Sequence, residues 1–191
     1  FMSKYYLTPD NTPEISGLLW PNPKQIETFT MTDQNDNEFG IDNLRGKWSF
    51  VFFGYTNCPD VCPITMSVLK QVNEQLIASG IPEVFQIIFV SVDPQRDSVT
   101  KLNEYINFFN PEFIGLGGDI EQLESLTGQI GIAYMYGLPE EDGEYLVDHT
   151  SSIFLLDPQA RLVSILSPPH QSDSIVGRFQ EITRFINNNT P

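Results

Sequence analysis

The chain has 191 residues, of which 40% are apolar or aromatic and 18% are charged. This length and composition are typical of one packed globular domain and exclude a low-complexity or disordered chain. Its 25 acidic against 10 basic residues give a formal net charge of −15, which excludes nucleic acid as a partner because such a surface repels phosphate backbones.

The first residues of the chain carry no clear structural pattern. Residues 1–22 predict an irregular N-terminal extension, and residues 23–188 predict one folded domain. No stretch reaches the roughly 20 apolar residues that cross a bilayer. The abrupt start lacks a signal peptide and is consistent with the removal of an upstream membrane anchor.

The first half of the domain predicts alternating strands and helices. Residues 26–44 contain two half-apolar runs around a polar turn, which is typical of a β-hairpin. Continuous apolar runs at Trp48–Phe53 and Phe85–Val92 are typical of strands covered on both faces. Apolar residues at helical spacing predict helices over Pro63–Ala78 and Val99–Phe109. This βαβ order implies a parallel sheet with a right-handed crossover.

The second half predicts a change of pattern. A short apolar run at 113–116 and a helix over Ile120–Ile130 precede a flexible loop at 137–145. A second hairpin over 152–166 and a final helix over Asp173–Ile186 follow. A dithiol where the first core strand meets its helix favours a thioredoxin-like α/β fold. We expect a central mixed sheet flanked by helices, with an extra N-terminal β-hairpin.

Two cysteines, Cys58 and Cys62, stand four positions apart at this strand–helix junction. Cys62 falls at the predicted helix N-terminus, where free amides and the helix dipole are expected to lower its pKa. The spacing allows the two sulfurs to form a disulfide or to face one metal ion. A purely structural disulfide is disfavoured, because so short a loop would gain little stability.

The third candidate ligand is His149, which lies far along the chain at the entry to the second predicted hairpin. In a thioredoxin-like layout, the loop before this hairpin lies at the same sheet edge as the end of the first core strand. His149 can therefore approach Cys58 and Cys62, with Asp148 as a candidate to orient the imidazole. Two thiolates and an imidazole match copper, whereas structural zinc usually takes four ligands. The other histidine, His170, is predicted to face solvent.

Three sequence blocks resemble the signature blocks of the Sco/SenC family. They are Phe53–Pro63 (FGYTNCPDVCP), Ser91–Asp97 (SVDPQRD) and Val147–Thr150 (VDHT). Leu44–Trp48 (LRGKW) is similar as well, and the resemblance extends from about Pro23 to Ile186. Three ordered blocks at family-like spacing are far more specific than a lone dithiol. The resemblance implies a thioredoxin-fold copper chaperone for cytochrome c oxidase assembly.

The resemblance also implies what the residues do. Cys58, Cys62 and His149 would bind copper, as Cu(I) or Cu(II), and help deliver it to the dinuclear copper site of cytochrome c oxidase subunit II, or keep that site's cysteines reduced. Other periplasmic copper chaperones or thiol reductants would be further partners. Members are usually tethered by one N-terminal transmembrane helix and face the bacterial periplasm or the mitochondrial intermembrane space. Asn57 stands where many members carry histidine. We interpret Ser91–Asp97 as a structural turn beside the site.

Two other thiol functions remain open. A thiol–disulfide oxidoreductase would use Cys58 and Cys62 as a redox dithiol without metal. The usual motif of such an oxidoreductase has two residues between the cysteines, whereas this chain has three. An oxidoreductase of this kind also has no need of His149. A peroxide-reducing relative is disfavoured, because no arginine lies near Cys58 in the sequence. A metallochaperone is therefore favoured over an enzyme.

Overall fold

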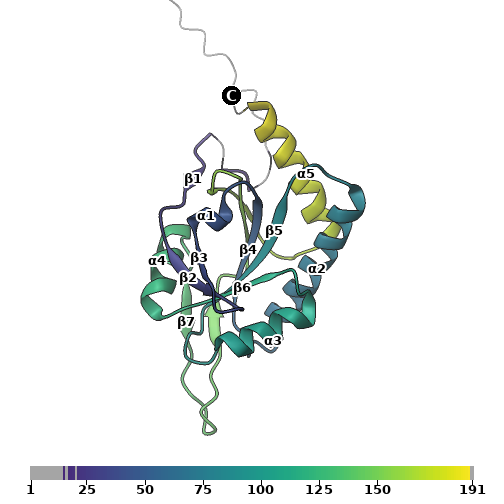
Figure 1. The fold of residues 1–191 in the computed structure, drawn as a ribbon. Helices are drawn as coiled ribbons and strands as arrows, with labels where there is room; N and C mark the ends of the chain where they lie inside the picture. Colours follow the sequence, from purple (N-terminus) through teal and green to yellow (C-terminus); the bar gives the residue numbers. More distant parts are fainter. Residues whose placement is uncertain (1–14, 16, 20, 190–191) are drawn as a thin grey trace, which may run out of the picture.

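The computed structural model describes residues 15, 17–19 and 21–189. Eight of the strands in this part of the chain form one sheet: β1 (Lys24–Gln25), β2 (Thr30–Asp33), β3 (Glu38–Gly40), β4 (Trp48–Gly54), β5 (Phe85–Ser91), β6 (Ile114–Gly117), β9 (Ile153–Leu156) and β10 (Arg161–Leu166). Their order across the sheet is β1-β10-β9-β4-β5-β6-β2-β3 (Figure 1). The neighbours of β5 run parallel to it, and β9 runs antiparallel to β4, so the sheet is mixed as predicted.

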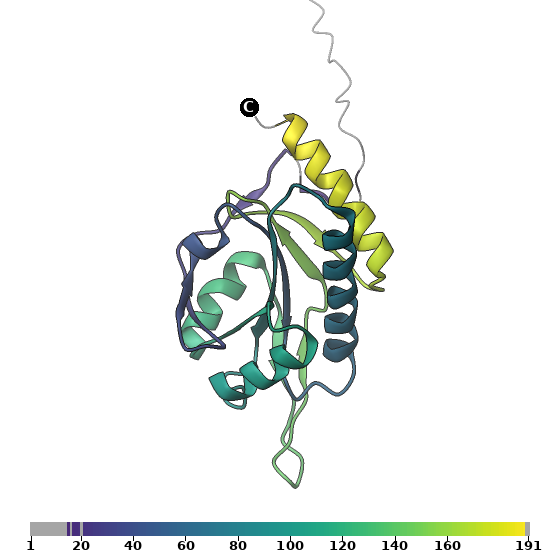
Figure 2. The ribbon, with the colours of Figure 1, turned by 45° about the vertical axis from the view of Figure 1, so that its right-hand side comes forward.

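Helices cover both faces of this sheet. They are α1 (Ile41–Leu44), α2 (Val61–Ser79), α3 (Val99–Phe109), α4 (Ile120–Ile130) and α5 (Ser172–Asn189). Helices α2 and α5 pack together on one face, and α4 lies on the other (Figure 2). All seven residues of β4 are buried, as expected for a strand covered on both sides.

Aromatic packing fixes α5 to the centre of the sheet. Phe179 of α5 meets the ring of Trp48 edge-on at a centroid distance of 5.5 Å and lies 5.1 Å from the ring of Phe50. Both partners belong to β4, so the strand that leads to the cysteines is anchored at its start by the last helix. On the same strand Val51 points to the opposite face, because side chains alternate along a strand.

Most elements lie where the sequence predicts them. The bounds of α3 and α4 agree with the prediction, and Gly80 ends α2 in a left-handed conformation with φ 63°. Helix α2 begins at Val61, two residues before the predicted start, so Cys62 already belongs to its first turn.

The predicted flexible loop at 137–145 proves to be the end of a β-hairpin. It joins β7 (Tyr134–Tyr136) to β8 (Val147–His149), which form a separate two-stranded antiparallel sheet. This hairpin projects from the domain at the end away from α5 (Figures 1 and 2). His149 is therefore the last residue of a strand and not part of a loop.

Most of the predicted N-terminal extension, residues 1–22, lies outside the described residues. Within the described part, Leu18 forms a β-bridge with Ser164 of β10, and its neighbour Leu19 donates a backbone hydrogen bond to Val163. Among the described residues, no helix is both long enough and apolar enough to cross a membrane.

Candidate metal centre

The cysteine loop begins where β4 ends at Gly54 and finishes where α2 begins. A turn closes it, since the Cys58 amide donates to the Tyr55 carbonyl at 3.2 Å. Gly54 has no side chain because there is no room for one: a Cβ would lie 2.9 Å from the Cys62 sulfur and 2.8 Å from the Phe89 ring. The bare backbone of Gly54 thus lets the cysteine pack directly onto the end of the sheet.

The structure brings the three predicted ligands together. One ligand atom each from Cys58, Cys62 and His149 lie within 4.8 Å of one another. The Cys62 sulfur is 3.4 Å from His149 Nε2. Cys62 is buried, whereas Cys58 and His149 are half-buried, so the cluster opens to the surface on one side. Both cysteines are free thiols.

The imidazole of His149 is oriented by the backbone of the next residue. Its Nδ1 lies 3.1 Å from the Thr150 carbonyl, which can only accept a hydrogen bond, so Nδ1 carries a proton and Nε2 is the nitrogen that faces the Cys62 sulfur. The rings of Phe52 and Tyr55 lie edge-on to the imidazole, each at a centroid distance of 6.0 Å. Asp148, which the sequence suggested as the residue that orients the imidazole, is exposed. The Thr150 carbonyl takes this role instead.

The pKa values of the two thiols are shifted in opposite directions. A hydrogen bond from Cys62 lowers the pKa of the Cys58 thiol to about 4, against the effect of partial burial and with a further contribution from His149. The pKa of Cys62 is raised, because its thiol proton is held by Cys58 and its side chain is buried. The prediction of a lowered pKa at Cys62 is therefore wrong. The first-turn amide of Cys62 instead points at the Cys58 sulfur, 3.4 Å away, so the helix N-terminus favours the Cys58 thiolate.

The sequence that forms this three-donor cluster lies within a stretch that matches a known family. The model of the SCO1/SenC family matches residues 21–184. The chain belongs to the SCO1/SenC family. Its thioredoxin-like fold, predicted from the strand and helix order, agrees with the solved Sco structures.

Two relatives and one solved structure illustrate this membership. The chain is 36% identical over 158 residues to the mitochondrial SCO1 homolog 1 of Arabidopsis thaliana, covering 82% of this chain and 47% of that protein. It is 37% identical over 148 residues to the mitochondrial SCO2 homolog of Bos taurus, covering 77% and 55%. The chain thus spans about half the length of these two relatives. The crystal structure of Arabidopsis thaliana ScoI with copper bound superposes with a TM-score of 0.76 at 31% identity, covering 85% of this chain and 98% of that one.

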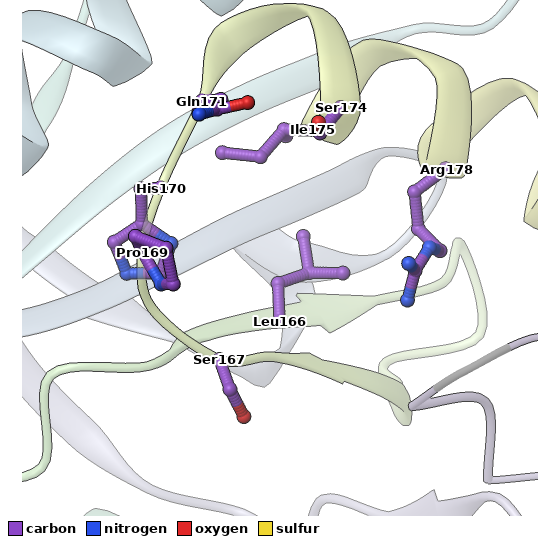
Figure 3. Close-up of a pocket in the computed structure, with 8 residues that line it drawn as sticks. All are labelled: Leu166, Ser167, Pro169, His170, Gln171, Ser174, Ile175 and Arg178. Atoms are coloured by element: carbon purple, nitrogen blue, oxygen red, sulfur yellow. The ribbon is translucent and has the colours of Figure 1, made fainter.

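The second histidine of this SCO1/SenC chain lies in a different part of the fold. His170 lines a hollow beside the start of α5 with Leu166, Ile175 and Arg178 (Figure 3). Its Nε2 is 2.8 Å from the Ser151 carbonyl, and the side chain is half-buried. His170 is therefore less exposed than predicted, because it is half-buried and bonded to the backbone. His170 is not in the cluster of Cys58, Cys62 and His149.

The cysteine loop has a buried support that the sequence did not reveal. Asp97 is 5% exposed and accepts hydrogen bonds from the Thr56 amide at 3.0 Å, the Thr56 hydroxyl at 2.6 Å and the Ser91 hydroxyl at 2.6 Å. Ser91–Asp97 is a strand end and turn beside the site, as predicted. The signal that could have identified its role is the pair of aspartates in SVDPQRD, directly after a buried strand.

Folding also brings an arginine to the site that is distant in sequence. The Arg96 guanidinium lies 5.7 Å from the centroid of the Tyr55 ring, although the argument against a peroxide-reducing protein relied on the absence of an arginine near Cys58 in sequence. This guanidinium is paired with the carboxylates of Asp93 and Glu144. Arg96 is thus held by acidic partners beside the site.

Proposed function

We propose that this chain binds one copper ion through Cys58, Cys62 and His149 and delivers it to a partner. The observation that supports the proposal is the convergence of two sulfurs and an imidazole nitrogen within 4.8 Å. Each donor comes from a different position around the junction of β4, α2 and β8. A purely structural role does not require these three side chains to meet.

The donor set fits copper better than the other common metals. Thiolate sulfur is a soft ligand that selects Cu(I), and imidazole binds both copper oxidation states. The lowered pKa of Cys58 favours its thiolate form, and Nε2 of His149 faces the Cys62 sulfur. A structural zinc site would call for a fourth ligand, and the described residues contain no fourth His, Cys, Asp or Glu in this cluster.

The recipient that we propose is the dinuclear copper site of cytochrome c oxidase subunit II. The chain would load copper there or keep the cysteines of that site reduced. Support comes from family membership and from relatives described as mitochondrial SCO1 and SCO2 homologs. We place the protein in the bacterial periplasm, held by an inner-membrane anchor, with the mitochondrial intermembrane space as the alternative. Periplasmic copper chaperones or thiol reductants would be further partners of this protein.

A copper titration of the reduced protein tests the binding proposal. Wild type should bind about one copper per chain, and its Cu(II) form should show sulfur-to-copper charge-transfer absorption. His149→Ala should lose this band, because one of the three donors is removed. His170→Ala is the matched control, since this imidazole lies outside the cluster, and its spectrum should equal that of wild type. Equal copper binding by wild type and His149→Ala would refute the proposed ligand set.

A thiol–disulfide oxidoreductase is the second candidate, favoured by the opposite pKa shifts of the two thiols. The Cys58 thiolate would attack a substrate disulfide, form a mixed disulfide and release one substrate thiolate. Cys62 would then attack Cys58, release the second substrate thiol and leave a Cys58–Cys62 disulfide, so two electrons pass to the substrate. Rapid reduction of a disulfide substrate by metal-free protein, unchanged in His149→Ala, would favour this candidate over the metallochaperone.

A further inference from the structure

The turn after β5 contacts both halves of the proposed copper site. One half is the cysteine loop, and the other is the β7–β8 hairpin that carries His149. We propose that Arg96 in this turn is a positioning residue that holds His149 against the two sulfurs. The inference rests on the proposed copper function and goes beyond it, because it assigns the site's affinity partly to a residue that touches none of the three ligands.

The first half is fixed to the turn through Asp97. Its carboxylate accepts two hydrogen bonds from Thr56, which is two residues before Cys58. The Asp97 amide donates to the Asp93 carbonyl at 3.0 Å, so the turn itself is closed. Ser91 bonds both aspartates, since its hydroxyl donates to Asp97 and accepts from the Asp93 amide at 3.0 Å. The cysteine loop and the turn therefore behave as one unit.

The second half is fixed to the same turn through Arg96. Its guanidinium carbon lies 3.5 Å from the centroid of the Tyr145 ring, and its Nη1 donates to Glu144 at 3.0 Å. Both residues belong to the segment that leads into β8. The Tyr145 hydroxyl donates to Asp93 at 2.7 Å, and the Tyr136 hydroxyl donates to the Val92 carbonyl at 2.8 Å. These contacts join the turn to β7 and to the segment just before β8.

Arg96 is central to these contacts because its side chain is largely removed from water and contacts three groups, namely Asp93, Glu144 and the Tyr145 ring. Its side chain is 14% exposed, and that of its partner Asp93 is 0% exposed. The guanidinium lies over the Tyr145 ring and within 5.7 Å of the centroid of the Tyr55 ring, and the Tyr55 ring lies edge-on to the His149 imidazole. A flat cation that stacks and pairs at once suits arginine and not lysine.

A further contact joins the hairpin directly to the cysteine loop. Glu144, which pairs with Arg96, also accepts a hydrogen bond at 3.2 Å from Asn57, the residue before Cys58. Lys101 of α3 donates to the Asn57 side-chain oxygen. Removal of Arg96 would leave the Glu144 carboxylate, with 60% of its side chain exposed, as a weakly held contact. The position of His149 would then depend on a less constrained hairpin.

The test compares Arg96→Met with Arg161→Met. Arg161 forms a similar buried ion pair with Asp157, with side-chain exposures of 22% and 0%. That pair lies at the start of β4, because Leu156 pairs with Ser49, whereas the cysteines follow the end of β4. Both variants leave a buried aspartate unpaired, so they are matched in their expected loss of stability. Only Arg96→Met should alter the site.

The first measurement is the copper dissociation rate from each variant, taken by transfer to a competing chelator. Arg96→Met should release copper about 10-fold faster than wild type. A loss of this size is typical when a residue that orients a metal ligand, without binding the metal itself, is replaced. Arg161→Met should release it at the wild-type rate. In a His149→Ala background, Arg96→Met should cause no further change, because its effect acts through the imidazole. The metal-free protein gives a second measurement, in which the NMR signals of the His149 ring should broaden in Arg96→Met only.

The milder variant Tyr145→Phe covers the case in which Arg96→Met does not fold. It keeps the ring under the guanidinium and removes only the hydroxyl bond to Asp93. It should release copper several-fold faster than wild type. Wild-type release rates in both Arg96→Met and Tyr145→Phe would overturn the inference, as would an undiminished effect of Arg96→Met without His149. A wild type that binds no copper would instead refute the proposed function.

Discussion

Replacement of Gly54 by alanine should disturb the packing of the cysteine pair against the end of β4. A Cβ at this position would lie 2.8 Å from the Phe89 ring, 2.9 Å from the Cys62 sulfur and 3.3 Å from the Phe52 ring. Ordinary van der Waals contact begins near 3.4 Å, so both the sulfur and the Phe89 ring would have to give way by about half an ångström. Phe52 and Phe89 are fully buried and cannot move outward.

Overpacking of this kind costs about 1–3 kcal/mol in the free energy of unfolding. For a domain of this size each kcal/mol lowers Tm by about 2–4 °C. Because binding constellations tolerate displacements of only about 0.5 Å, the copper affinity should fall as well, with a change in the charge-transfer spectrum. Gly54→Ala should therefore reduce both the stability of the metal-free protein and the affinity of the site.

The matched control is Gly177→Ala in the exposed middle of α5. A Cβ there meets no atom within 4 Å, so the substitution should stabilise the protein by about 0.5–1 kcal/mol, since alanine favours a helix over glycine. Denaturant titration of both reduced, metal-free variants measures the two opposite effects. If Gly54→Ala unfolds at the same denaturant concentration as wild type and keeps its copper spectrum, the packing argument at the end of β4 is refuted.

Three further predictions follow from the thiol pair, the support of the cysteine loop and the core. Because the folded pKa of Cys58 is lowered, its thiolate stabilises the reduced protein above the ordinary thiol pKa, and this contribution is lost as the pH falls through about 4. Iodoacetamide should therefore label Cys58 readily at pH 6 in wild type and more slowly in Cys62→Ala, which lacks the hydrogen bond; equal labelling rates would contradict this. Asp97→Asn removes one acceptor oxygen of a buried carboxylate and should lower the free energy of unfolding, measured by denaturant titration, by about 1–3 kcal/mol. An unchanged unfolding midpoint would contradict this prediction. Phe179→Ala should cost about 3–5 kcal/mol but leave the copper dissociation rate at its wild-type value, since this ring packs at the start of β4; faster release would show that the core and the site are coupled.

The sequence predicted the framework because the framework is built from long periodic segments. The buried run at Trp48–Phe53 and the apolar stripes of α3 and α4 leave few alternatives to strand and helix. The approach of His149 to the cysteines followed from topology, because the end of β4 and the segment before β9 meet at one sheet edge. A short hairpin such as β7–β8 gave no comparable signal, because each of its strands has only three residues.

The details that the sequence missed depend on contacts between distant residues. The helix-dipole argument gave Cys62 the lower pKa, but which thiol ionises depends on burial and on the direction of one hydrogen bond, and both favour Cys58. Arg96 is separated from Glu144 by 48 positions, and its contact with the hairpin leaves no periodic trace in the sequence. Such contacts can be inferred only after the fold has placed the turn between the two halves.

The two halves of the proposed site differ in how firmly they are held. Cys62 is buried in the first turn of a 19-residue helix, against the backbone at the end of β4, so its sulfur cannot move without disturbing the core. His149 ends a three-residue strand of a projecting hairpin whose links to the domain include the turn around Arg96. Local opening costs least where few buried contacts hold a segment. Displacement of the hairpin would therefore separate the His149 imidazole from the two sulfurs and leave Cys58 and Cys62 as the remaining ligands of the proposed site.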